Sequence, residues 1–189
     1  MGAHNAAMTN ALASPADIVG FWRDAGPQKW FRKDAGFDGV FRDRFLASHE
    51  AAARGELASW SDSPEGALAL VLLLDQFPRN AFRNTPRMFA SDPAARAAAD
   101  AAIAAGRDTQ VEPALRPFFY MPFMHSEDPR DLERCVALME PIGGDSLHFA
   151  QDHRAIVARF GRFPHRNAVL GRASTAEEVR FLAEGGFSG

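Results

Sequence analysis

The sequence predicts an all-α fold, a compact array of about seven or eight short helices. Three kinds of observation support this. Proline follows a residue that favours the N-cap at five places, which marks helix starts at Ser14, Ser63, Thr85, Asp92 and Asp128. Helix stops follow at Gly106, at Pro141–Gly144, at Gly161 and at Gly185–Gly186. No segment shows the sustained alternation of apolar and polar residues that is typical of a strand.

The first helices are predicted from their caps and from their apolar faces. Ser14 with Asp17 resembles a capping box, so a helix begins at Pro15. The segment from Glu65 to Phe77 is apolar on nearly every face, which suits a central helix that neighbours bury on several sides. Its position in the chain makes it the centre of the predicted core.

The later helices follow the same logic. Alanine fills most of Ala94–Ala105, which allows close approach between helices. After Asp145, apolar residues and one histidine form a stripe that would lie on the core: Phe149, His153, Ile156, Val157 and Phe160. Ser174 with Glu177 matches a capping box and predicts a last helix. Antiparallel helix pairs in a bundle, or a helical-repeat-like stack, would accommodate these elements.

The length fits one domain. Residues 1–13 are small and polar without periodicity and are expected to form a disordered tail, and residues 14–189 are expected to form a single helical domain. The longest apolar run, around Ala67–Leu74, is far too short to span a bilayer, so we expect a soluble cytoplasmic protein without a membrane partner. Cys135, the only cysteine, is expected to pack as a small apolar residue.

The charge of the chain and its motifs exclude several function classes. A net charge of -3 and a pI near 6.1 argue against nucleic acid as a partner. His148 and His153 are five residues apart, whereas helical zinc pairs need two histidines four apart and a third ligand. The chain has no phosphate-binding glycine loop and no nucleophile elbow. We therefore expect no metal and no cofactor.

Three polar segments suggest one site. Phe77–Asn80 and Phe163–Asn167 nearly repeat each other, and each places arginine and asparagine beside a proline-stopped turn after an apolar helix. Tyr120–Asp128 lies between them. Asp75 ends the most apolar helix, where the helix dipole disfavours a carboxylate unless a cation compensates it. The candidate partners of Asp75 are Arg79, Arg83 and Arg166.

Two interpretations of these residues stay open. A structural network of aspartate, arginine and asparagine would tie the turn to the core. Alternatively, a pocket would bind an anionic ligand through side chains from all three segments, namely Asp75, Arg79, Asn80, Arg83, Tyr120, His125, Arg166 and Asn167. His125 and His165 are the candidates for acid or base chemistry, with a carboxylate near His125 to orient the imidazole.

These segments also resemble a known family. The combination of Leu74–Asn80, Tyr120–Glu127 and Arg159–Asn167, together with Val19–Trp22 and Trp30–Phe31, is similar to the uncharacterised bacterial family known as domain of unknown function 924. The resemblance runs from about Ile18 onward. It implies an all-helical, tetratricopeptide-like fold and no established activity.

Three functions are consistent with the sequence. The first is a non-enzymatic protein that binds a small anionic ligand or an acidic peptide terminus. The second is a hydrolase or transferase that acts on an anionic substrate, with His125 or His165 as general base. The third is a helical scaffold that binds protein partners through an exposed helical face.

Overall fold

The computed structural model describes residues 12–189, and every regular element in this range is a helix. The α-helices are α1 (Pro15–Ala25), α2 (Pro27–Trp30), α3 (Ala35–Ala53), α4 (Pro64–Val71), α5 (Phe77–Ala81), α6 (Asp92–Ala104), α7 (Met121–Met124), α8 (Pro129–Met139), α9 (Gly144–Phe160) and α10 (Ala176–Ala183). Short 3₁₀ helices cover Ala58–Asp62, Pro86–Met88, Asp108–Gln110, Arg116–Phe119 and Pro164–Arg166. The described residues therefore confirm the predicted all-α class.

A π-helical segment, Leu72–Gln76, joins α4 to α5 without a break. Counted in this way, residues 12–189 contain nine helices, seven of which have at least 7 residues. The continuous helix from Pro64 to Ala81 is the centre of the main core, as predicted, because α1, α3 and α6 all pack against it. Ala95, Ala99 and Ala102 of α6 are buried, so the alanine-rich segment does face neighbouring elements.

Most helix starts were predicted correctly. Ser14 and Asp17 form the predicted capping box, and the side chains of Ser63 and Asp128 cap α4 and α8. Thr85 precedes only a short 3₁₀ helix and makes no capping hydrogen bond through its side chain.

Two predicted caps are wrong. Asp92 is the first residue of α6, with Ser91 at the N-cap position, because the carboxylate of Asp92 turns away to bind an arginine. The last capping box is formed by Thr175 and Glu178, one residue later than predicted.

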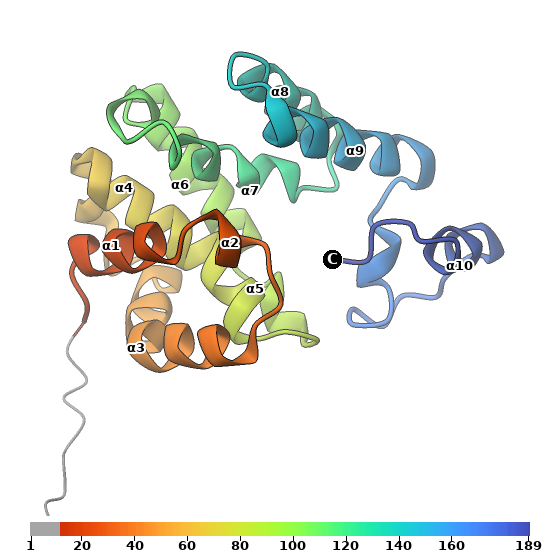
Figure 1. The fold of residues 1–189 in the computed structure, drawn as a ribbon, viewed down its shortest axis with the longest axis horizontal. Helices are drawn as coiled ribbons and strands as arrows, with labels where there is room; N and C mark the ends of the chain where they lie inside the picture. The colour runs from red at the N-terminus through yellow and green to blue at the C-terminus, as the bar shows by residue number, and fades with distance from the viewer. Residues whose placement is uncertain (1–11) are drawn as a thin grey trace, which may run out of the picture.

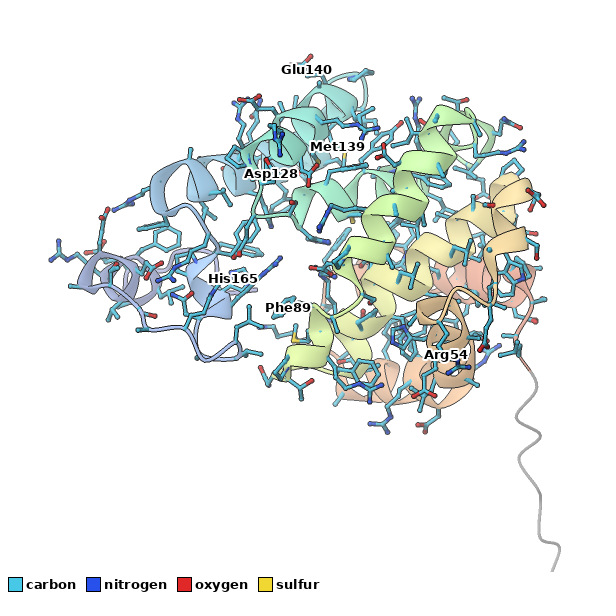
Figure 2. All side chains as sticks on the ribbon, turned by 180° about the vertical axis from the view of Figure 1, so that it is seen from behind. Arg54, Phe89, Asp128, Met139, Glu140 and His165 are labelled. Carbon is cyan, nitrogen blue, oxygen red and sulfur yellow. The ribbon has the colours of Figure 1, made fainter. Side chains whose placement is uncertain are left out.

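The C-terminal part of the chain has a small core of its own. α8 and α9 lie side by side, and Leu132, Ile156, Val157 and Phe163 form an apolar cluster separate from the main core. Figure 1 shows α10 at the opposite end of the molecule from α1, and Figure 2 shows Phe89 on the bundle side and His165 on the C-terminal side of the junction between them.

Glu127 fastens the C-terminal part to the turn after α7. Its carboxylate accepts hydrogen bonds from the Phe163 N–H (2.8 Å) and from the Arg172 guanidinium (2.8 and 3.0 Å). This paired contact fixes the direction in which the chain leaves α9.

The remaining expectations concern the tail, the membrane and the cysteine. Residues 1–11 of the predicted tail lie outside the described residues, and the Ala13 N–H donates to the Ser48 hydroxyl (3.0 Å).

None of the helices in residues 12–189 combines the length and the hydropathy that crossing a bilayer requires. Cys135 is fully buried, and its thiol donates to the Tyr120 carbonyl (3.4 Å). It therefore packs as a small buried residue, as predicted.

Candidate functional site

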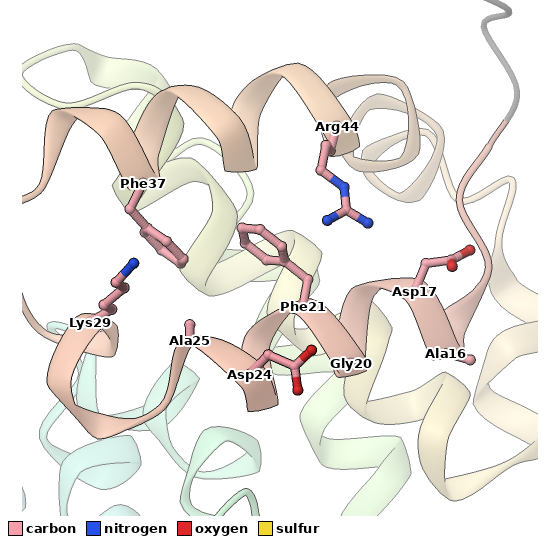
Figure 3. Close-up of a pocket in the computed structure, with 9 residues that line it drawn as sticks. All are labelled: Ala16, Asp17, Gly20, Phe21, Asp24, Ala25, Lys29, Phe37 and Arg44. Carbon is pink, nitrogen blue, oxygen red and sulfur yellow. The ribbon is translucent and has the colours of Figure 1, made fainter.

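A cavity of about 400 Å³ lies between α1, α2 and α3. Figure 3 shows the rings of Phe21 and Phe37 on its walls, with charged side chains, among them Lys29 and Arg44, around them. None of the site residues predicted from the sequence lines this cavity. The predicted residues that do come together lie instead around the π-segment.

The π-segment exists at the point where Pro78 interrupts the helical hydrogen bonds. The Phe77 N–H reaches back five residues to the Leu72 carbonyl, and Pro78 has no N–H to offer. Side chains from other elements donate hydrogen bonds to the carbonyl groups that have no helical partner near Pro78. His49 of α3 donates from Nδ1 to the Leu73 carbonyl (2.8 Å), and the Ser91 hydroxyl donates to the Leu74 carbonyl (2.6 Å). Pro78 therefore does not stop the helix, and Asp75 lies inside it.

Asp75 is completely buried, and its carboxylate is fully occupied by partners. Oδ1 accepts from His125 Nδ1 (2.7 Å) and lies 3.1 Å from Arg79 Nη1, while Oδ2 accepts from Gln76 Nε2 (2.7 Å). Burial alone would raise the pKa of Asp75, but His125 and Arg79 outweigh burial and lower that pKa to about 2. Asp75 is therefore an ionised carboxylate at neutral pH.

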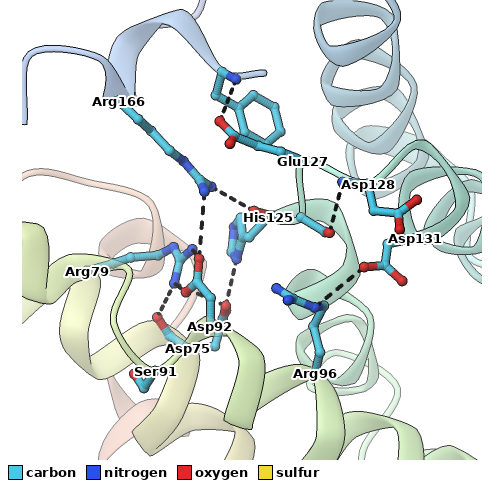
Figure 4. Close-up of polar contacts among 12 residues, drawn as sticks. Asp75, Arg79, Ser91, Asp92, Arg96, His125, Glu127, Asp128, Asp131 and Arg166 are labelled. Atoms are coloured by element: carbon cyan, nitrogen blue, oxygen red, sulfur yellow. Dashed lines mark hydrogen bonds and ion pairs between the residues drawn. The ribbon is translucent and has the colours of Figure 1, made fainter. Parts of the chain in front are cut away.

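Arg79 binds two carboxylates, as Figure 4 shows. Its guanidinium donates two hydrogen bonds to Asp92 (2.8 and 3.0 Å), and Nη1 also donates to the Asp75 main-chain carbonyl (2.8 Å). This bidentate geometry is the strong form of an arginine–carboxylate pair. The charge of Arg79 is consequently balanced within the protein by Asp75 and Asp92.

Arg166 is less well compensated. Its Nη2 donates to the His125 main-chain carbonyl (2.8 Å), Nη1 lies 3.7 Å from Asp92 Oδ2, and Nε is buried without a partner among the described residues. The guanidinium carbon lies 4.5 and 4.7 Å from the ring centroids of Phe89 and Phe163. Burial, together with repulsion from Arg79, lowers the pKa of Arg166 to about 10. A lowered pKa means that the surroundings offset this positive charge only in part.

His125 follows α7, and Asp75 orients its ring. An ionised carboxylate can only accept a hydrogen bond, so the contact to Asp75 places the imidazole proton on Nδ1. Burial and the nearby charge of Arg79 lower the pKa of His125. The ring is therefore neutral at pH 7 and has its lone pair on Nε2. This atom makes no hydrogen bond to residues 12–189, and 15% of the side chain is exposed.

Two further histidines lie beside His125. The His153 ring lies 6.4 Å from the His125 ring, and its Nδ1 donates to the Phe149 carbonyl (2.8 Å). His165 Nδ1 is buried without a partner among the described residues. Both rings pack against Phe187 near the C-terminus, at 4.6 and 5.1 Å. Within residues 12–189, no group of three histidine, cysteine or acidic side chains is placed to hold a metal ion.

The structure brings together Asp75, Arg79, His125 and Arg166 and leaves the other candidates apart. Asn80 and Arg83 both bind Asp38 of α3 (2.7 and 2.5 Å). The Tyr120 hydroxyl donates to Asp108 (2.5 Å), and Asn167 donates to Ser174 (3.1 Å) and to Glu178 (3.2 Å). Asn80, Arg83, Tyr120 and Asn167 therefore bind partners outside the cluster, while Arg79, His125 and Arg166 bring one side chain from each segment to it.

Sequence reasoning also missed two members of the cluster and one interaction. Asp92 was interpreted as a helix cap, and nothing in the sequence pointed to Phe89. The carboxylate that orients His125 was expected among its neighbours in sequence, yet it is Asp75, 50 residues away. The one available signal was the unusual position of a carboxylate in an apolar helix.

Comparison with known proteins places the chain in a family. The model of a family described as bacterial protein of unknown function (DUF924) matches residues 18–186. The chain is 57% identical to the protein of unknown function ATU0120 from Agrobacterium tumefaciens, whose structure has been solved. The two structures superimpose with a TM-score of 0.89, and the match covers 90% of this chain and 97% of ATU0120. No curated protein matches. The chain belongs to the DUF924 family of bacterial proteins, as the three sequence segments suggested.

Proposed function

We propose that the protein binds a small anionic ligand at the cluster of His125 and Arg166. The observation that supports this best is the incomplete compensation of a buried arginine beside a histidine whose Nε2 has no partner among the described residues. A carboxylate or phosphate would supply the negative charge needed to balance the Arg166 guanidinium. A hydroxyl or amine of the same ligand would donate a hydrogen bond to His125 Nε2.

The other cluster residues position these two. Asp75 holds the His125 ring in one tautomer and one orientation, and Arg79 links Asp75 to Asp92. Because Asp75 and Asp92 already bind Arg79, we assign it a structural role. Its side chain and that of His125 are each 15% exposed, and that of Arg166 is 8% exposed, so all three keep some contact with solvent.

The test is a thermal-shift screen of phosphate esters, small carboxylic acids and peptides with acidic C-termini. A ligand at a hundredfold excess over its Kd stabilises the fold by about 2.7 kcal/mol. We expect the shift to disappear in Arg166→Gln and in His125→Asn, whose amide still reaches Asp75 but lacks the Nε2 acceptor. Arg130→Gln is the matched control, because that arginine is 89% exposed. A ligand that stabilises the wild type and all three variants equally would refute this site.

A second candidate function is acid–base catalysis by His125. The specific observation is the hydrogen bond from His125 Nδ1 to a buried carboxylate, the arrangement that makes the opposite nitrogen a base. His165 Nδ1 is buried and contacts no carboxylate within residues 12–189. If a ligand from the screen is turned over, His125→Asn should lower kcat by about 10²- to 10⁴-fold. Unchanged turnover in this variant would exclude His125 as the catalytic base, and absence of turnover in the wild type would favour simple binding.

The finer fold assignment and the scaffold function stay predictions. Tetratricopeptide-like pairing of the helices would provide a surface for protein partners. The argument for this function rests on resemblance of fold, which does not by itself establish a function.

A further inference from the structure

A second cavity, of about 340 Å³, lies beside α3 and the start of α6. Three alanines form part of its wall, and its polar residues are His49, Glu50, Arg54, Arg87 and Ser91. Figure 2 shows Arg54, at this cavity, well away from His165. None of the residues of the proposed anion site lines it.

His49 lies in the wall of this cavity, and one of its ring nitrogens is an acceptor without a hydrogen-bond partner among residues 12–189. The residue is 6% exposed, and its ring stacks on Phe77 at 4.8 Å. Nδ1 contacts the Leu73 carbonyl, which can only accept, so the proton lies on Nδ1 and the lone pair on Nε2. Burial lowers the pKa of His49, and Arg87 lowers it further, which keeps the ring neutral. Nε2 has no hydrogen-bond partner among residues 12–189.

The two arginines at the cavity differ in what they already bind. Arg54 donates two hydrogen bonds to Glu56 (2.7 and 2.9 Å). Arg87 lies 3.6 Å from Glu50, beyond hydrogen-bonding distance, and stacks on the Phe82 ring at 3.8 Å while 56% of its side chain is exposed. Arg87 is therefore paired with Glu50 by charge alone, and, unlike Arg54, its guanidinium donates no hydrogen bond within residues 12–189.

We propose that this cavity is a second ligand site, which takes a small carboxylate that carries a hydroxyl or ammonium group on the adjacent carbon. Arg87 binds the carboxylate, and His49 Nε2 accepts a hydrogen bond from the hydroxyl or ammonium group. Glu50, at the same rim, favours the ammonium form. This inference does not depend on the anion site at His125, because the two sites share no residue.

NMR titration of the isotope-labelled full chain tests the site with three probes of one carbon skeleton: lactate, L-alanine and propionate. We expect saturable shifts of the His49 ring signals with lactate and alanine. Propionate, which lacks the donor, should bind at least about tenfold more weakly. The same loss is expected in Arg87→Gln and in His49→Asn, whose amide still donates to the Leu73 carbonyl. Arg54→Gln is the control, with a Kd within about twofold of the wild-type value.

Several results would overturn the proposal. The first is absence of saturation with both lactate and alanine. The second is equal affinity for propionate, and the third is an equal loss of binding in Arg54→Gln and Arg87→Gln, which would indicate general electrostatic attraction. A ring tautomer with the proton on Nε2 would exclude the acceptor directly. If His49→Asn does not fold, Arg87→Gln decides alone, because its side chain is largely exposed. His125→Asn should bind the probes like the wild type, which separates this site from the first.

Discussion

Asp75 is a buried charge that three neighbouring side chains keep ionised. Asparagine has the same shape but no charge, and its amide N–H₂ would face either the donors of His125 and Arg79 or the amide donor of Gln76. Removal of one partner from a buried ion pair typically costs about 3–5 kcal/mol. We therefore expect Asp75→Asn to lower the free energy of unfolding by about that amount, measured by urea denaturation.

Asp152→Asn is the control for this substitution. Asp152 lies 3.3 Å from His148 on the exposed face of α9, so its replacement should cost less than about 1 kcal/mol. A loss below about 1 kcal/mol in Asp75→Asn as well would show that the buried network contributes little to stability.

At the scale of residues, the sequence predicted local pairs and missed distant ones. Arg79 was a foreseeable partner of Asp75, because the two are four residues apart in one helix. Arg83 has the right chemistry but points to Asp38 of α3. The contact between Arg166 and Asp92 depends on how the C-terminal segment returns to the bundle, and local patterns carry no information about that return.

Gly66 marks the closest approach between two elements. A Cβ at this position of α4 would lie 2.2 Å from the Trp60 carbonyl oxygen and 2.8 Å from the Ser63 hydroxyl. Backbone atoms cannot yield cheaply, so Gly66→Ala should lower the free energy of unfolding by about 2–4 kcal/mol. Gly20→Ala is the matched control. It lies in α1 with nothing within 4 Å of the added methyl group, and it should stabilise by about 0.5–1 kcal/mol. Equal effects of the two substitutions in a denaturation experiment would contradict this packing.

At the scale of elements, caps and stops were predictable and the π-segment was not. Ser14, Ser63 and Asp128 act within four residues, so their capping role follows from local sequence. Pro78 also looked like a stop. It stays inside a helix because His49 and Ser91, from α3 and the start of α6, bind the carbonyl groups beside it. That compensation is tertiary, and the sequence around Pro78 does not contain it.

At the scale of the molecule, two cores meet across a polar junction. Apolar periodicity predicted the main core, because the Pro64–Ala81 helix is apolar on nearly every face. The same periodicity predicted that Ile156 and Val157 are buried, but the separation of their small core from the main core and the return of the chain to Arg166 were not predictable. The junction between the cores contains buried histidines, and this arrangement makes the whole fold sensitive to acid.

The sign of this pH dependence follows from the folded-state pKa values. Burial, with the neighbouring His125, lowers the pKa of His153 to about 4, and burial, with Arg166, lowers that of His165 to about 3. Both lie below the value of about 6.5 in the unfolded chain, so the unfolded state takes up protons first as the pH falls. Each histidine then lowers the free energy of unfolding as the pH falls below about 6.5, with a slope that approaches about 1.4 kcal/mol per pH unit once the unfolded histidine is almost fully protonated.

Urea denaturation between pH 6.5 and 5 measures this effect above the range in which the carboxylates titrate. His153 and His165 together should give a total fall of about 3 kcal/mol over this range, to which His49 and His125 add because their pKa values are also lowered. His153→Asn keeps a donor for the Phe149 carbonyl and should reduce the total fall over this range by about 1.5 kcal/mol. His148→Asn, at a side chain that is 66% exposed, should leave the slope unchanged. A free energy of unfolding that stays constant over this range would mean that the buried rings take up protons in the folded protein over the same pH range as in the unfolded chain, so that burial does not lower their pKa values.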